Sequence, residues 1–174
     1  MQWSKAFKMA VNLSSQQFSQ GDCIEQVKAA LDKTGFDARR LKIEITETVI
    51  MQNTESASAM LRELKAMGVT LAMDDFGTGY SSLSYLHRFP LDVLKIDRSF
   101  IAQMSANSET DPIVSTILDL ARSLEVTVVA EGVESEEQLH LLRGMGCHFA
   151  QGFFFARPLT APHVEELLAH SPRW

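Results

Sequence analysis

The chain has 174 residues, and 16 lysines and arginines against 22 aspartates and glutamates give it a formal net charge of −6. Hydrophobic residues make up 45% and charged residues 22%, which excludes a disordered chain and is typical of a globular domain with its own core. The acidic balance argues against binding of a nucleic-acid polymer. No apolar run approaches the ~20 residues of a membrane helix, and the two cysteines match no metal-ligand spacing. We expect a single cytoplasmic domain without membrane contact.

Short apolar segments alternate with amphipathic ones, a pattern that predicts βαβ units and a parallel sheet of the α/β class. The expected strands are Phe7–Leu13, Leu41–Thr46, Thr70–Met73, Val93–Ile96, Val126–Ala130 and Phe149–Phe154. The expected helices are Asp22–Thr34, Thr54–Met67, a segment from Pro112 to Leu124, Ser135–Met145 and Thr160–Ala169. Asn53 is placed to cap the second helix, and Ser135 with Gln138 forms a capping box before the fourth.

Each predicted strand carries a polar side chain near its carboxyl end. The carboxyl ends of parallel strands meet at one rim of a barrel or sheet, so we expect these side chains to converge. Buried ions are costly unless they are paired or bound to a metal, and carboxylate and amide oxygens suit Mg²⁺ or Mn²⁺ rather than zinc. The residues concerned are Asn12, Glu44, Asp74, Asp75, Lys95, Asp97, Glu131 and Gln151. The pattern predicts a divalent-cation site.

Asp74 and Asp75 are the most informative pair. Adjacent residues on a strand point to opposite faces, so both reach one site only where the strand ends and the chain turns. We expect the residues Gly77-Thr78-Gly79 to supply that turn. One carboxylate can then bridge two ions about 3.5–4 Å apart while its neighbour binds the second ion. The alternative is an ordinary turn with a helix cap.

Lys95 and Asp97 are two residues apart and therefore face the same side of their strand. A lysine in an acidic metal site can hold or deprotonate an attacking water and can neutralise a phosphate oxygen. The alternative is a structural ion pair between Lys95 and Asp97.

Two pairs of glutamates are separated by three residues. Because an odd separation places side chains on opposite faces, we assign Glu44 to the metal and Glu47 to bracing the neighbouring loop. Glu131 and Glu134 have the same spacing, and one of them could instead cap the helix that begins near Ser135.

Six segments together are similar to the motif series of EAL domains, bacterial phosphodiesterases that hydrolyse the second messenger cyclic di-GMP. The segments are VNLS at 11–14, EITE at 44–47, DDFGTGYSSL at 74–83, LKIDRSF at 94–100, VAEGVE at 129–134 and AQGFFFARPL at 150–159. They occur in the order of the family and cover essentially the whole chain. The fold that this resemblance implies is a TIM-like barrel in which one of eight strands is antiparallel.

The resemblance also implies roles for the polar residues, in a two-ion site for Mg²⁺ or Mn²⁺ that opens cyclic di-GMP to linear pGpG. Asn12, Glu44 and Asp74 would bind metal, Asp75 would bind the second ion, and Glu131 would contribute directly or through water. Lys95 would act on the nucleophilic water. Asp97, Glu134 and Gln151 would support the substrate or the metal-bound water, and Pro158 is expected to line the nucleotide site. Glu47 would hold the loop 75–82, which in this family couples catalysis to dimerisation. We interpret Phe153-Phe154-Phe155 as barrel wall, with stacking of one ring on a guanine as the open alternative.

The chain departs from the family pattern at its start. It begins just before the VNLS strand, the first two family strands are absent, and no Glu-Ala-Leu triplet occurs. The absent strands would supply one metal-ligating glutamate and an adjacent arginine that helps to hold the substrate. Six strands, where eight close a barrel, leave two open edges, and we expect a homodimer, with or without swapped elements, to cover them. We therefore interpret residues 1–174 as an incomplete, N-terminally truncated EAL domain. It is either a phosphodiesterase or a module that binds cyclic di-GMP or a partner without chemistry.

Overall fold

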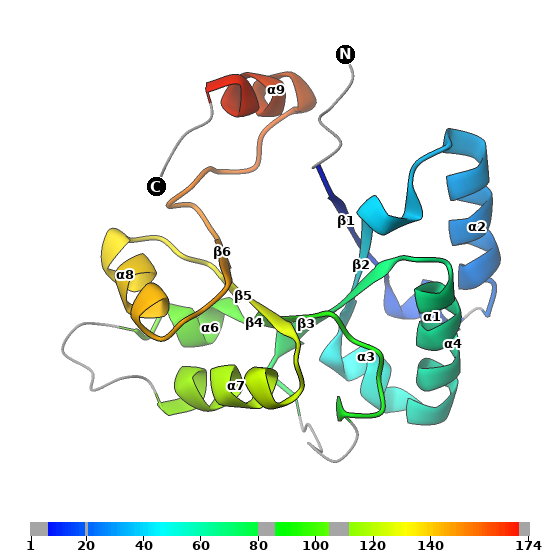
Figure 1. Ribbon diagram of the computed structural model, residues 1–174, viewed down its shortest axis with the longest axis horizontal. Helices are drawn as coiled ribbons and strands as arrows, with labels where there is room; N and C mark the ends of the chain where they lie inside the picture. The colour runs from blue at the N-terminus through cyan, green and yellow to red at the C-terminus, as the bar shows by residue number, and fades with distance from the viewer. Residues whose placement is uncertain (1–6, 20, 80–85, 105–111, 171–174) are drawn as a thin grey trace.

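A computed structural model, which describes residues 7–19, 21–79, 86–104 and 112–170, contains one curled sheet of six parallel strands. Each strand pairs with the next strand along the chain, in the order β1-β2-β3-β4-β5-β6. The strands are β1 Met9–Asn12, β2 Leu41–Thr46, β3 Thr70–Phe76, β4 Val93–Ile96, β5 Thr127–Glu131 and β6 Phe149–Gln151. This sequential order is that of a barrel, and Figure 1 shows that the curled sheet does not close. The predicted incomplete barrel is confirmed.

The helices follow the strands in the predicted alternation. They are α1 Ser15–Ser19, α2 Cys23–Thr34, the 3₁₀ helix η1 Ala38–Arg40, α3 Glu47–Gln52, α4 Thr54–Ala66, α6 Arg98–Ile101, α7 Pro112–Ser123, α8 Glu136–Gly144 and α9 Ala161–His170. The two predicted caps are present: the Asn53 side chain accepts from the Ser56 N–H, and Ser135 with Gln138 forms the reciprocal capping box. The short helices α1, α3 and α6 were not predicted. Among the described residues, no helix has the length and apolar character that crossing a membrane requires.

The last strand is shorter than predicted, ending at Gln151 instead of Phe154. The Val133 N–H donates to the Gln151 carbonyl, and the Phe154 N–H donates back to the Val133 carbonyl. Gly152 lies between these two bonds, where a Cβ atom would stand 2.2 Å from the Val133 carbonyl oxygen. The chain therefore turns against the residues that follow β5, and the strand cannot continue.

The main core lies between the outer face of the sheet and the helices. Alternate strand residues such as Ile45, Met73 and Leu94 are buried there against side chains of α4 and α7. The inner face has only a small apolar cluster, formed by Ala72, Val93 and Val129. Because side chains alternate along a strand, the residues in phase with these three are directed to the inner side. The polar side chains near the carboxyl ends of these strands therefore lie on the inner side of the sheet.

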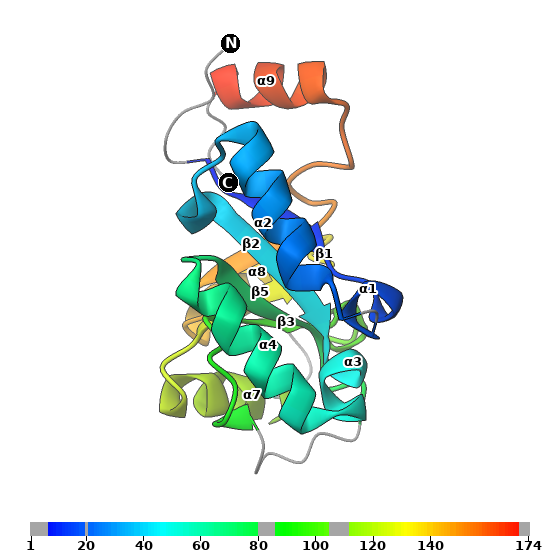
Figure 2. The same ribbon diagram turned by 90° about the vertical axis from the view of Figure 1, so that its right-hand side faces the viewer.

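Both edges of the sheet are open. All four residues of β1 are exposed, with Val11 47% exposed, and Phe149 on β6 is 64% exposed. Helix α9 buries none of its residues, and Figures 1 and 2 show it apart from the other helices, above the gap between β1 and β6. The open edges expected from the strand count are therefore present.

Gly152→Ala is expected to lower the free energy of unfolding by about 1–3 kcal/mol, because the new methyl group overlaps backbone atoms that cannot rotate away. The matched control is Gly144→Ala, since a Cβ atom at this α8 position meets nothing within 4 Å. That change should be neutral or stabilising by up to about 1 kcal/mol. Urea unfolding followed by circular dichroism measures both, and equal midpoints for the two variants would contradict the close approach at Gly152.

Candidate metal and catalytic site

A buried lysine lies at the centre of the polar residues on the inner face. The Lys95 Nζ atom is 2.6 Å from Glu44 Oε2, 2.8 Å from Glu131 Oε1 and 3.0 Å from Asp74 Oδ1. Only 4% of Lys95 is exposed, and Glu44 and Asp74 are also buried. The four residues stand on the four neighbouring strands β2, β3, β4 and β5. The side chains predicted to converge at the strand ends do so here.

The three carboxylates determine the charge state of Lys95. Burial by itself would lower the pKa of Lys95, but the hydrogen bonds to Glu131, Glu44 and Asp74 raise it above its ordinary value. These bonds therefore favour the charged form of the Lys95 side chain. The predicted roles of Lys95, holding or deprotonating a water and neutralising a phosphate oxygen, stay predictions. The alternative pairing with Asp97 is wrong, because the three ion pairs of Lys95 are with other residues.

Asp74 and Asp75 reach one site by a route that differs from the prediction. Strand β3 continues through both residues to Phe76, and its register with β4 shifts between Met73 and Phe76. Asp75 has a φ of 53°, in the left-handed region, and its N–H donates to Asp74 Oδ1. A bulge at Asp75 thus breaks the alternation of the strand, and the glycine turn begins only after it. The expectation that Gly77-Thr78-Gly79 brings the two carboxylates together is wrong in this respect.

Three carboxylates form a group that suits a divalent ion. Ligand atoms of Asp74, Asp75 and Glu131 all lie within 4.8 Å of one another. Burial, followed by the charges of Asp74 and Asp97, raises the pKa of Asp75. Burial also raises the pKa of Glu131, in spite of its bond to Lys95. Hard oxygen donors crowded in this way fit Mg²⁺ or Mn²⁺, which would relieve their repulsion.

Glu47 connects helix α3 to the loop that follows β3. Its side chain is 1% exposed, and Oε2 accepts the Gly77 N–H at 2.9 Å. A Cβ atom on Gly79 would stand 2.6 Å from Glu47 Oε1, so only glycine allows the loop to come this close. The contacts agree with the predicted bracing role over residues 77–79. The remainder of the predicted loop, 80–82, lies outside the described residues.

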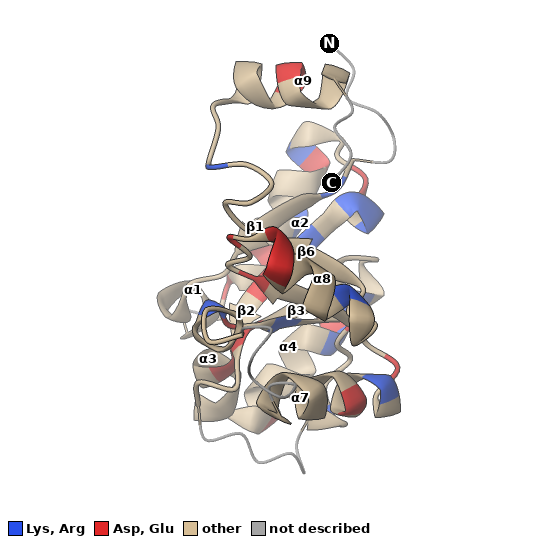
Figure 3. Cartoon of the chain, turned by 90° about the vertical axis from the view of Figure 1, so that its left-hand side faces the viewer, with Lys and Arg blue, Asp and Glu red and all other residues tan. Residues whose placement is uncertain are grey.

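A cleft of about 540 Å³ opens beside the carboxylates. It is lined by Asp75, Thr78, Asp97, Arg98, Glu131, Gly132, Glu134, Gln151, Gly152 and Phe153. Five of these were singled out from the sequence, namely Asp75, Asp97, Glu131, Glu134 and Gln151. The first turn of α8, which carries Glu136 and Glu137, adds an acidic surface that Figure 3 shows in red.

The sequence reasoning missed Thr78 and Arg98, and it left Phe153 open. Arg98 directly follows Asp97 in the LKIDRSF segment, and its position just after a strand end was the signal that could have found it. Phe153 is exposed, with the Arg157 guanidinium 4.7 Å from its ring centroid. It is therefore not part of a closed barrel wall, and it lines the cleft beside the carboxylates.

Asp97 caps helix α6 by accepting the Ser99 N–H at 2.9 Å. Burial alone would raise the pKa of Asp97, but its bonds to Ser99 lower it below its ordinary value. Glu131 and Glu134 do not cap helix α8, because Ser135 does, so that alternative is wrong.

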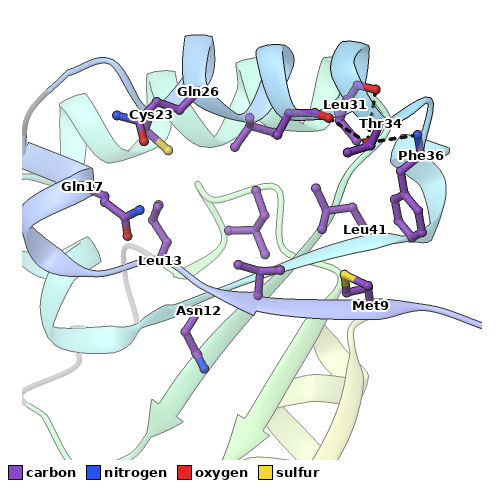
Figure 4. A pocket seen from close by; sticks show the side chains of 14 residues that line it. Met9, Asn12, Leu13, Gln17, Cys23, Gln26, Leu31, Thr34, Phe36 and Leu41 are labelled. Carbon is purple, nitrogen blue, oxygen red and sulfur yellow. Dashed lines mark hydrogen bonds between the residues drawn. The ribbon is translucent and has the colours of Figure 1, made fainter. Parts of the chain in front are cut away.

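Asn12 and Pro158 neither line the cleft nor take part in the ion pairs of Lys95. Asn12 is exposed at the end of β1, paired in register with Glu44, and Figure 4 shows its side chain on the side of the strand away from α2. It is therefore a neighbour of Glu44 on the adjacent strand. Pro158 is exposed and is not among the residues that line the cleft. Their predicted roles stay predictions.

Comparison with known proteins decides the family. Residues 1–158 match the model of the EAL domain. The chain belongs to the EAL domain family. This confirms the resemblance stated from the six motif segments.

Named relatives of this EAL chain come from several bacteria. It is 42% identical over 161 residues to the cyclic di-GMP phosphodiesterase NbdA of Pseudomonas aeruginosa, covering 92% of this chain and 21% of NbdA. It is 44% identical over 163 residues to the bifunctional diguanylate cyclase/cyclic di-GMP phosphodiesterase MucR of the same organism, covering 94% of this chain and 23% of MucR. The chain thus spans about a fifth of the length of these relatives.

Solved EAL structures share the fold. The cyclic di-GMP complex of the MucR phosphodiesterase superposes with a TM-score of 0.86 at 43% identity, over 90% of this chain and 64% of that one. A manganese and cyclic di-GMP complex of Klebsiella pneumoniae BlrP1 gives a TM-score of 0.77 at 34% identity, over 87% of this chain and 39% of that one.

Glu47→Ala is expected to lower the free energy of unfolding by about 1–3 kcal/mol, because it leaves the Gly77 N–H without its buried acceptor. The control is Glu63→Ala, an exposed glutamate of α4 whose loss should change stability by less than about 0.5 kcal/mol. Chemical denaturation of both variants is the measurement. A Glu47→Ala midpoint equal to that of Glu63→Ala would show that Glu47 does not hold the loop.

Proposed function

We propose that this chain carries the catalytic rim of a cyclic di-GMP phosphodiesterase that acts in the cytoplasm and yields linear pGpG. The observation that carries the proposal is the group formed by Asp74, Asp75 and Glu131, with ligand atoms within 4.8 Å, beside the buried cation Lys95 and open to a cleft. The names of NbdA and MucR and the ligand of the MucR complex support the choice of substrate.

The ions that the family implies fit the residues present. Asp74, Asp75 and Glu131 would hold them, with Glu44 and Asn12 next to this group on β2 and β1. When bound, Mg²⁺ or Mn²⁺ ions lower the pKa of a coordinated water and stabilise charge on the phosphoryl oxygens.

The side chains of the cleft would position the substrate. The Lys95 ammonium, whose N–H groups face Glu44, Glu131 and Asp74, would act through its positive charge, stabilising negative charge that develops on a phosphoryl oxygen. Arg98, the only lysine or arginine among the described residues of the cleft lining, would pair with a phosphodiester. The exposed ring of Phe153 would stack on a base, and Gln151 and Glu134 would donate or accept hydrogen bonds at its edge.

We also propose that a second copy of the chain covers the open edges. Among the described residues, β1 has no strand on its outer side, and it carries the exposed apolar side chains of Met9 and Val11. Between β1, β2 and α2 lies an apolar hollow of about 400 Å³, into which Figure 4 shows Leu13, Leu31 and Leu41 pointing. Such edges and apolar surfaces are sites of association, and helix α9, none of whose residues is fully buried, would cover those of the second copy.

The competing function is a module that binds cyclic di-GMP without hydrolysing it. The open β1 edge favours this function, because the rim beside Asn12 and Glu44 is bounded by no further strand among the described residues.

Incubation of the 174-residue chain with cyclic di-GMP and Mn²⁺, followed by chromatography, is expected to yield linear pGpG, with no product in EDTA. Asp74→Asn should reduce the rate at least about a hundredfold, because it weakens the ion site and the stabilisation of phosphoryl charge. The control Asp119→Asn, an exposed aspartate of α7, should keep the wild-type rate. Binding of cyclic di-GMP by calorimetry without any product would reject hydrolysis in favour of the binding module.

Sedimentation velocity at micromolar concentration is expected to show a dimer. Val11→Asp should shift the equilibrium to monomers, because it places a charge on the apolar side of the β1 edge. Glu63→Lys on the exposed face of α4 should leave the dimer intact. A wild-type chain that sediments as a monomer would reject this mode of covering the edges.

A further inference from the structure

A divalent ion in this site would bind carboxylates that also pair with Lys95. Asp74 and Glu131 belong to the group with mutually close ligand atoms, and both are also ion-pair partners of Lys95, at 3.0 and 2.8 Å. Glu44, the third partner at 2.6 Å, is buried as well. A carboxylate oxygen that accepts a hydrogen bond from an ammonium group is a poorer ligand for a metal.

The charges of the site indicate whether Lys95 strengthens or weakens the binding of divalent ions. Glu44, Asp74, Asp75 and Glu131 carry four formal negative charges, which two divalent ions would neutralise by themselves. The ammonium of Lys95, which pairs with three of these carboxylates, would then be a surplus positive charge in the same site. Repulsion between cations in one site is strong where burial limits solvent screening, and Lys95 is 4% exposed. A phosphodiester, with one negative charge, would balance that surplus.

We propose that Lys95 restrains the affinity of the site for divalent cations, because its ammonium group competes with them for Glu44, Asp74 and Glu131. The inference rests on the proposed function, since it takes these carboxylates to be the ion site. Lys95 thus has two roles. It is the counter-ion that stabilises the buried carboxylates in the folded chain, and it prevents the divalent ions from binding too tightly. Its removal should strengthen ion binding, whereas a residue that only positions the carboxylates would weaken ion binding when removed.

Calorimetric titration with Mn²⁺ of the wild-type chain, Lys95→Met and Lys65→Met tests the proposal. Lys65→Met is the matched control, because Lys65 pairs with Asp92 at the amino end of β4, away from the rim. Lys95→Met is expected to bind Mn²⁺ at least about tenfold more tightly than the wild type, and Lys65→Met equally tightly. Without ions, Lys95→Met should melt at a lower temperature, and Mn²⁺ should raise its melting temperature more than that of the wild type.

A second measurement uses the wild-type chain and does not depend on the folding of Lys95→Met. In spectra of ¹⁵N-labelled lysine ammonium groups, the signal of Lys95, assigned with Lys95→Arg, should move on addition of Mg²⁺, while that of Lys65 stays. An unchanged Lys95 signal at a Mg²⁺ concentration that saturates calorimetric binding would overturn the proposal that Lys95 and the ions compete for the same carboxylates.

The outcomes separate the two proposals. Binding to the wild type with equal or weaker binding to Lys95→Met overturns the role of Lys95 and leaves the proposed function standing. Absence of Mn²⁺ binding to all three chains overturns the ion site and the proposed function together.

Discussion

The ion pairs of Lys95 with Glu44, Asp74 and Glu131 are the interaction on which the rim of the sheet depends. A buried ammonium group without partners costs several kcal/mol, and so does a buried carboxylate. Because the three partners stand on three different strands, the strands must keep their register for these charges to be paired. Two of these partners, Asp74 and Glu131, also belong to the group of mutually close carboxylates, so the ion pairs that stabilise the rim also help to assemble the site.

The position of this cluster explains how an open sheet can retain a site. Its members belong to β2, β3, β4 and β5, each of which has a strand on both sides. The edge strands β1 and β6 carry residues at the periphery of the site. Asn12 of β1 lies next to Glu44, and Gln151 of β6 lies next to Glu131. The carboxylates of the cluster therefore stand on strands that are paired on both sides, while the incomplete barrel is open at the boundaries of the cleft.

The bulge at Asp75 explains how the two adjacent aspartates of the DDFGTGYSSL segment can face one site. In a regular strand the side chains of Asp74 and Asp75 would lie on opposite faces. The left-handed backbone of Asp75 rotates its carboxylate to the inner side, at a cost that the surrounding contacts must offset. Glu47, which accepts the Gly77 N–H two residues later, is one of these contacts. The Asp-Asp pair and the glutamate before α3 are thus parts of one arrangement.

The sequence by itself determined the alternation of strands and helices, the caps at Asn53 and Ser135, and the gathering of Glu44, Asp74, Lys95 and Glu131 at one rim. Hydrophobic periodicity and capping are local properties, and parallel strands bring their carboxyl ends together whatever their exact register. Only the tertiary structure decided that Asp75 reaches the site through a bulge, that Lys95 pairs with three carboxylates rather than with Asp97, and that Arg98 and Phe153 face the same cleft. These features depend on distances between residues far apart in the chain. Strand register, close packing at glycines such as Gly152, and the burial of charge set those distances.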